Sequence, residues 1–204
     1  MSTTRSHWDD TYAAKAETEV SWFQTAPERS LALIEKALGG RNGGILDVGG
    51  GASRLVDSLL DRGYRDLTVL DISEIALGKN RARLGQKADT VSWIVADITQ
   101  WQPQRVWKLW HDRAVFHFLT DPADQDAYIA ALTRATAPGS WVLMACFALD
   151  GPERCSGLPV QRYSAATLAA RLGSAFTLVE EARESHATPG GKIQNFTYAL
   201  FRRL

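Results

Sequence analysis

The stretch GGILDVGGGASRL, from Gly43 to Leu55, runs from a short apolar segment through three successive glycines into a helical pattern. A glycine loop between a strand and a helix is typical of nucleotide-binding α/β folds, but several ligands use such loops. A dinucleotide loop needs a third glycine where Arg54 stands, and no Gly-Lys-Ser/Thr of a phosphate-binding loop follows. An acid beside the glycines suits a cationic group better than a pyrophosphate. The pattern present is acid-x-Gly-x-Gly-x-Ser, formed by Asp47, Gly49, Gly51 and Ser53.

Strand-like runs and helical patterns alternate along the rest of the chain, as in a parallel sheet that helices cover on both faces. Runs of strand length are found at 44–49, 66–72, 91–98, 106–112, 140–149, 176–186 and 193–203. Helical spacing is found at 27–40, 53–63, 73–85 and 124–139. Only ATPGGK separates the last two strands, which predicts an antiparallel hairpin at the sheet edge. The sequence therefore predicts an α/β fold with a mostly parallel sheet and an antiparallel C-terminal hairpin.

Two further acids end the second and third predicted strands. Asp71 follows the glycine loop at about the twenty-residue distance at which an acid meets ribose hydroxyls in such folds. Asp97 could accept a hydrogen bond from an adenine amine, while the Ile98 backbone addresses the ring and Ile72 packs on its face. Either acid alone could simply cap the next helix. Adenine, ribose and a cationic amino-acid tail together describe S-adenosylmethionine.

The phrases ILDVGGGAS, VLDIS and VADI, in this order and spacing, resemble the first three motifs of the class I S-adenosylmethionine-dependent methyltransferases. The resemblance covers most of the chain, from about Trp8 to the last strand. It implies a Rossmann-like, doubly wound sheet of seven strands with the last one reversed. The chain departs from the family pattern at Ser53, where many members carry a third glycine, but a small residue keeps the loop tight. We expect one domain over residues 1–204, with an aromatic arm at 1–26 and a Rossmann-like core at 27–204.

The phrase DRAVFH, at residues 112–117, resembles the Asp-Arg-Gly-Ala stretch of thiopurine S-methyltransferases, with Ala114 in place of glycine. That resemblance implies that Asp112 lies near the cofactor and that Arg113 faces the acceptor. Candidates for a general base are His111 and His117, because histidine titrates near neutral pH. A histidine near a strand end is, however, more often structural.

The N-terminal segments HWDDTYAAK and SWFQ resemble the aromatic cap of the same group and of lysine methyltransferases that act on folded proteins. The resemblance implies that Trp8, Tyr12, Trp22 and Phe23 cover the cofactor, with ordinary core packing as the alternative. Methyl transfer is an in-line displacement, so the protein mainly supplies alignment and exclusion of water. A closing aromatic arm suits that task.

The segment at 148–164 is rich in Gly and Pro and follows the fifth predicted strand, so a long loop is expected at the functional edge of the sheet. Cys155 within it could touch an acceptor or a soft metalloid, although a lone cysteine usually has no such role. The last hairpin adds polar groups near the sheet edge. Arg162 and Tyr163 are comparable acceptor-pocket candidates, and the polar groups of the hairpin are His186 and Gln194, which the sequence does not place toward or away from the pocket.

The amino-acid composition limits the classes of partner that the chain is expected to bind. The 204 residues are 45% hydrophobic, which fits one domain with its own core, and 23 basic residues balance 23 acidic ones. This balance predicts no nucleic-acid or membrane partner. The chain shows no signal peptide and no apolar run of spanning length, so a soluble, cytoplasmic protein is expected. Cys146 and Cys155 are too few for a disulfide framework and have no metal-ligand spacing to histidine, so no metal is expected.

Three hypotheses for function remain open. The first is S-adenosylmethionine-dependent methyl transfer to a small molecule, such as a thiol or another soft nucleophile. The second is transfer to a lysine of a protein partner, and the third is a cofactor-binding module without turnover. A dehydrogenase is the alternative for the fold. The sequence leaves the oligomeric state and the acceptor undetermined.

Overall fold

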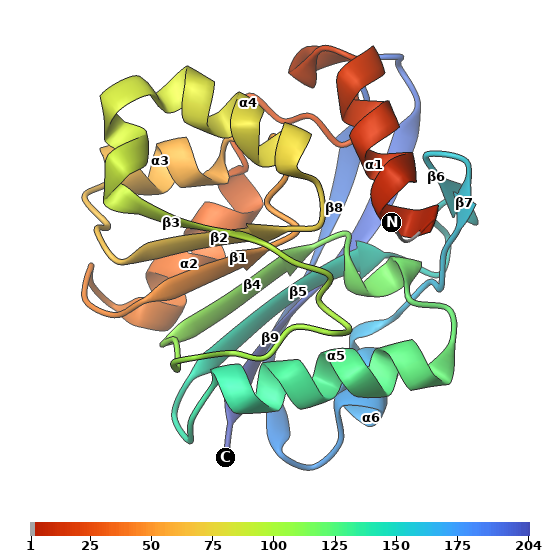
Figure 1. Cartoon of the computed structure of the whole chain (residues 1–204). Coiled ribbons are helices and arrows are strands. Elements are labelled where there is room, and N and C mark those ends of the chain that lie inside the picture. The colour runs from red at the N-terminus through yellow and green to blue at the C-terminus, as the bar shows by residue number, and fades with distance from the viewer. Residues whose placement is uncertain (1–2) are drawn as a thin grey trace.

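A central seven-stranded sheet organises the structure, a computed structural model in which residues 3–204 are described (Figure 1). The strand order is β3-β2-β1-β4-β5-β9-β8; β1 to β5 pair in parallel, and β9 runs antiparallel between β5 and β8. The strands are β1 (Ile45–Val48), β2 (Leu67–Asp71), β3 (Val91–Val95), β4 (Leu109–Arg113), β5 (Trp141–Phe147), β8 (Phe176–Ala187) and β9 (Ile193–Arg203). The predicted doubly wound sheet with an antiparallel C-terminal hairpin is confirmed.

Helices cover both faces of the sheet, as Figure 1 shows. On one face lie α2 (Glu28–Leu38), α3 (Leu55–Asp61) and α4 (Glu74–Leu84). On the other lie α5 (Pro122–Ala135) and α6 (Ala165–Leu172). Short 3-10 helices are η1 (Glu17–Glu19), η2 (Gly85–Thr90) and η3 (Phe116–Phe118), and a small separate hairpin joins β6 (Arg154–Cys155) to β7 (Leu158–Pro159). No helix among the described residues is long and apolar enough to cross a bilayer.

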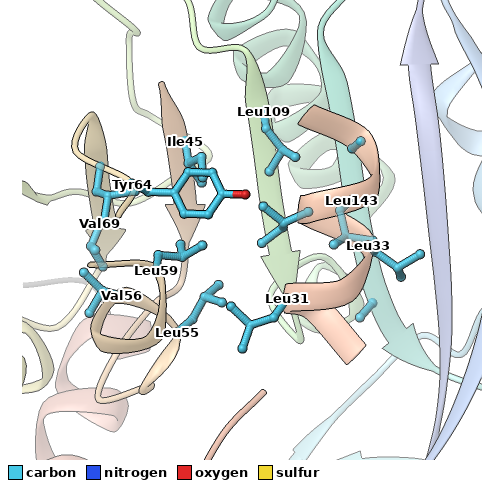
Figure 2. Close-up of a cluster of buried hydrophobic side chains, with 14 of the residues drawn as sticks. Leu31, Leu33, Ile45, Leu55, Val56, Leu59, Tyr64, Val69, Leu109 and Leu143 are labelled. Carbon is cyan, nitrogen blue, oxygen red and sulfur yellow. The ribbon is translucent and has the colours of Figure 1, made fainter. Parts of the chain in front are cut away.

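Two apolar cores, one on each face, hold these layers together. Figure 2 shows the first, in which leucines of α2 and α3 meet the inner strands. Its members include Leu31, Leu55, Leu59, Ile45, Leu109 and Leu143. The second packs α5 and α6 on the opposite face, around Trp110, Tyr128, Leu132 and Leu168. Because β1 and β2 are buried on both sides, their sequences are nearly continuous apolar runs, broken by Asp47, Thr68 and Asp71.

The predicted aromatic arm is a helix, α1 (Thr3–Ala14), followed by the η1 turn. Figure 1 shows α1 lying over the carboxyl edge of the sheet, beside α4 and the β6–β7 hairpin. The side chain of Lys79 on α4 donates to the carbonyl oxygens of Tyr12 and Lys15, and Ser73 Oγ donates to Asp9 Oδ1 at 2.6 Å. These bonds hold the arm across the edge where ligands bind in open α/β sheets.

Candidate functional site

A hollow with an empty volume of about 880 Å³, part of it open to solvent, lies at the carboxyl ends of the parallel strands. The ends of β1 to β4 form its floor, β5, β9 and the β6–β7 hairpin add a wall, and α1 covers it. We call this hollow the main pocket. The predicted site residues that line it are Trp8, Tyr12, Trp22, Gly49, Asp71, Ile72, Asp97, Ile98 and Arg113.

A smaller hollow of about 530 Å³ adjoins the main pocket on the α2 side. The two share Trp22, Gly49 and Arg113. The predicted site residues that line only this side pocket are Phe23, Asp47, Ser53 and His111. In the described part of the chain, neither lining includes Gly51, Asp112 or His117.

The glycine loop is held where only glycine fits. Gly49 has a φ of 66° and donates its N–H to the Leu70 carbonyl at 2.7 Å. A Cβ at Gly49 would overlap Val115 Cγ2, and one at Gly51, with a φ of 46°, would overlap the Tyr12 hydroxyl. Both positions combine a left-handed backbone with close approach of another segment. The glycines therefore let the arm and the β4 turn close onto the loop.

The two strand-end acids line the main pocket and also hold the backbone that follows them. Asp71 is 6% exposed, and its Oδ1 accepts from the Ser73 N–H at 2.8 Å. Burial, above all, raises the pKa of Asp71 to about 7. Asp97 Oδ1 accepts from the N–H and hydroxyl of Thr99 at 3.0 and 2.7 Å. The structural and ligand-binding interpretations of these acids are therefore compatible.

His111 points to the α2 side of the sheet. Its Nδ1 lies 2.6 Å from Asp47 Oδ1, and its Nε2 lies 2.9 Å from Ser30 Oγ on α2. All three groups are buried. His111 thus links Asp47 to α2 beneath the side pocket and does not line the main pocket.

Asp112 points to the opposite face and shapes the turn after β4. Its two carboxylate oxygens accept from the N–H groups of Val115 and Phe116 at 2.9 and 3.1 Å, and from the Tyr128 hydroxyl. Burial raises the pKa of Asp112 to about 6. Ala114 in this turn has a φ of 73°, a strained value outside glycine. Asp112 therefore acts on the main pocket through the backbone of the turn, rather than from the lining where the resemblance implied it.

Arg113 lies between the two hollows and is almost fully engaged. Its Nε donates to Tyr198 Oη at 3.1 Å and its Nη1 to the Trp22 carbonyl at 3.2 Å, while its guanidinium carbon lies 4.4 Å from the centre of the Phe196 ring. Buried Nη2 has no hydrogen bond among the described residues, and Glu184 Oε2 lies 3.7 Å away. One donor of this cation is thus free to meet a ligand.

His117 is fully buried behind the main pocket. Its Nδ1 accepts from the Phe147 N–H at 3.3 Å, which leaves the proton on Nε2. Burial, followed by the nearby Arg113 charge, lowers the pKa of His117 to about 3. A neutral imidazole placed this way is not positioned to take a proton from an acceptor. Nothing in its surroundings supports the role of base considered for it.

Aromatic rings of the arm form the roof of the main pocket. The Trp8 ring centre lies 5.0 Å from that of Phe118 and 5.8 Å from that of Trp22, and Tyr12 and Trp22 are 5.9 Å apart. Phe23 lines the side pocket instead, under the guanidinium of Arg54.

Arg54, the residue that breaks the dinucleotide pattern, anchors the arm. Its Nη2 lies 2.6 Å from Glu17 Oε1, and Arg83 Nη1 lies 2.5 Å from Glu17 Oε2. These ion pairs lower the pKa of Glu17, overriding partial burial, which acts in the opposite direction. The position that a dinucleotide loop reserves for glycine here fixes η1 against the start of α3.

Among the loop and hairpin residues considered from the sequence, Cys155 and Gln194 line the main pocket. Burial raises the pKa of the Cys155 thiol to about 11, so it stays protonated at neutral pH. The other three have different neighbours: Tyr163 Oη accepts from Gln125, His186 Nε2 bonds the Ser21 carbonyl at 2.8 Å, and Arg162 pairs with Glu153. Sequence patterns gave no signal for the apolar wall, which includes Phe118, Phe147 and Phe196.

Comparison with known proteins agrees with this geometry. Residues 45–139 match the methyltransferase domain family. This match covers a little under half of the chain. The matched range contains the glycine loop, both strand-end acids and the β4 turn.

Curated relatives align with this chain over 94 residues, 46% of its length. Nodulation protein S of Rhizobium tropici is 31% identical there, and the alignment covers 39% of it. The eEF1A lysine and N-terminal methyltransferase of Mus musculus is 28% identical, with 13% of it covered. The chain therefore spans less than half the length of these curated relatives.

A solved structure resembles almost the whole chain. The N-methyltransferase NodS from Bradyrhizobium japonicum WM9, in complex with S-adenosyl-L-homocysteine, superposes with a TM-score of 0.73. It is 19% identical and covers 97% of this chain and 98% of its own. At this identity the likeness establishes the fold alone, and the predicted Rossmann-like fold is confirmed.

Proposed function

We propose that this protein is an S-adenosylmethionine-dependent methyltransferase that acts on a small-molecule nucleophile. The observation that carries the proposal is the convergence of Gly49, Asp71 and Asp97 on one pocket roofed by the aromatic arm. The glycine loop, Asp71 as the proposed ribose-binding acid and Asp97 as the proposed adenine-binding acid follow three adjacent strands. They lie at the edge where α/β sheets bind their ligands.

The residues present fit the cofactor. Asp71 would accept from the ribose hydroxyls and Asp97 from the adenine amine, with Ile72 and Ile98 against the ring. Gly49 lines both hollows, so the amino-acid tail could follow the loop toward the side pocket, where the Asp47 carboxylate suits its ammonium group. When bound, S-adenosylmethionine would supply a methyl group from its sulfonium centre and leave as S-adenosylhomocysteine.

The acceptor end of the main pocket favours a nucleophile that loses its proton without a general base from the protein. We define this end by Arg113, Phe118, Phe147, Cys155, Gln194 and Phe196. Its titratable side chains are a guanidinium and a thiol with a raised pKa, and neither accepts a proton at neutral pH. A thiol ionises near pH 8.5, and a neighbouring cation favours its thiolate. A thiol or a comparably acidic nucleophile therefore suits this end.

The similarity to a lysine methyltransferase makes the lysine side chain of a protein the second candidate for the methyl acceptor. Its ammonium would have to lose a proton, since its ordinary pKa is about 10.4. The Arg113 side chain, only 10% exposed, would repel it before that loss, with Glu184, 3.7 Å from Nη2, offsetting part of the charge. These charges favour the small-molecule acceptor. A binding module without turnover would take up the cofactor and methylate neither class.

Calorimetric titration tests the cofactor. We expect the protein to bind S-adenosylmethionine and S-adenosylhomocysteine and to bind neither NAD nor NADP, because Arg54 with its Glu17 partner occupies the third-glycine position. Tight binding of a dinucleotide would overturn the proposed function and revive the dehydrogenase interpretation.

The pH dependence of turnover tests the absence of a protein base. With an aromatic and an aliphatic thiol, which differ in pKa, we expect kcat/KM to rise with pH and to level off at each acceptor's own pKa. When S-adenosylmethionine is kept saturating at every pH, titration of Asp71 does not affect the rate, and the protein contributes no inflection because His117, with its pKa near 3, is already neutral. One common inflection near pH 6.5 for both thiols would instead indicate a histidine base. Methylation of lysine peptides with none of thiols would favour the second candidate.

A further inference from the structure

Gln194 presents a buried polar atom that the fold does not use. The residue lies on β9, is 7% exposed and lines the main pocket. Its Oε1 is buried and has no hydrogen-bond partner among the described residues. Because most buried amide oxygens are hydrogen-bonded, an orphan on a side chain that lines a pocket calls for a ligand as its partner.

A second glutamine of the same chain shows how a structural amide is treated. Gln125 on α5 is 8% exposed, close to the value for Gln194. Its Nε2 donates to the Leu119 carbonyl at 2.7 Å and to Tyr163 Oη at 3.1 Å, and its Oε1 accepts from Arg171 at 2.5 Å. The fold thus satisfies the hydrogen bonds of the buried amide at Gln125 and leaves the amide oxygen of Gln194 without a partner.

Gln194 and Arg113 both line the main pocket, together with Phe196. Gln194 and Phe196 alternate with Asn195 on β9, so they share a face about 7 Å apart. The Arg113 guanidinium stacks on the Phe196 ring, and its Nη2 also lacks a hydrogen bond. One free acceptor and one free donor therefore flank the same aromatic ring at the acceptor end of the pocket.

The wall of this end of the pocket is apolar and consists of aromatic rings. Phe147 and Phe196 have ring centres 4.9 Å apart at an angle of 69°, and Phe118 completes the wall. Rings and flat apolar bodies pack well against such walls, while a few polar groups fix their orientation.

We propose that Gln194 selects the acceptor, with its Oε1 accepting a hydrogen bond from an N–H or O–H group on a flat, apolar-faced molecule. Arg113 Nη2 meets the ionised nucleophile of the same molecule. The assignment rests on the proposed function and adds the acceptor class: an aromatic body that carries a donor beside a soft, acidic nucleophile.

The test measures binding, so it does not depend on finding the true acceptor. Thiophenol and the 2-, 3- and 4-aminothiophenols differ by one donor group. Each is titrated into the protein saturated with S-adenosylhomocysteine. We expect at least one aminothiophenol to bind roughly tenfold more tightly than thiophenol, the size of one well-placed hydrogen bond.

Two leucine variants complete the test. In Gln194→Leu we expect the preference to vanish, with thiophenol and S-adenosylhomocysteine affinities unchanged and a Tm that does not fall, since an unsatisfied amide is removed. The side chain of the exposed Gln161 donates to the carbonyl of its neighbour Arg162 and lies outside the main pocket, so Gln161→Leu should keep the preference.

Each contrary result has a distinct meaning. Equal binding of all four thiols to the wild type, binding of none, or a preference retained in Gln194→Leu would overturn the assignment of Gln194. Failure of S-adenosylhomocysteine itself to bind would instead overturn the proposed function.

Discussion

Replacing Asp71 by alanine should weaken binding of S-adenosylmethionine about 100-fold. The change removes a buried carboxylate at the end of β2 that would accept from two ribose hydroxyls. Hydrogen bonds to a charged group contribute about 1.5–3 kcal/mol each, so losing the pair accounts for a change of this size. Calorimetric titration of the purified variant measures it directly.

Controls separate the loss of the ribose contact from loss of the fold. Asp66 precedes the opposite end of the same strand and forms an exposed pair with Arg105, so Asp66→Ala should bind the cofactor normally. Asp71→Asn can still accept from the Ser73 N–H and should fall between alanine and wild type. Unchanged affinity in Asp71→Ala would remove Asp71 from the ribose site.

The same carboxylate gives cofactor binding a pH dependence. Because burial raises the pKa of Asp71 to about 7, the group gains a proton as the pH falls below 7. The ribose hydroxyls need its ionised form as acceptor, so wild-type affinity should fall about tenfold from pH 8 to pH 6, with proton release on binding at pH 6. Asp71→Asn should show neither effect.

The strand-end residues of the site were predictable because their positions follow from the order of elements. Strand period and glycine punctuation located the ends of β1, β2 and β3, and parallel strands bring their carboxyl ends to one edge. Gly49, Asp71 and Asp97 therefore had to lie near one another. The helix α6 was missed although Ser164 forms a capping box with Thr167, a signal that short motif reading can find.

Residues on β4 were harder to place, because a strand alternates its side chains between two faces. Trp110 and Asp112 face α5, whereas His111 and Arg113 face α2, and only Arg113 reaches the main pocket. Alternation is visible in the sequence, but the face that opens into a pocket depends on what packs there. The same holds for Gln194, whose burial depends on the register of β9 between β5 and β8.

Contacts between segments far apart in the chain could not be predicted from the sequence. Arg54 was interpreted only as a residue that does not suit a dinucleotide. Its partner Glu17 lies 37 residues earlier, and Arg83 joins the pair from α4. A single sequence shows three charged residues at scattered positions, and only the folded chain shows that they fasten the arm.

Replacing Arg113 by methionine should lower kcat/KM for the acceptor at least 100-fold while leaving S-adenosylmethionine affinity within about threefold. The charge that faces the acceptor end is lost, and a charge-assisted contact to an ionised nucleophile contributes about 3 kcal/mol. The Tyr198 and Trp22 partners also lose a donor, so a moderate fall in Tm is expected. Steady-state kinetics with a thiol acceptor, beside calorimetry with the cofactor, measure both effects.

The choice of control decides what such a loss means. Arg183 on β8 forms an exposed pair with Asp150, so Arg183→Met removes an equal charge from the same sheet and should leave kinetics unchanged. Arg113→Lys keeps the charge without the planar fork and should recover part of the activity. Because Arg113 lines both hollows, a fall in S-adenosylmethionine affinity matching the fall in kcat/KM would assign the guanidinium to the cofactor's carboxylate. Intact cofactor binding with lost turnover would place it at the acceptor, beside the free amide of Gln194.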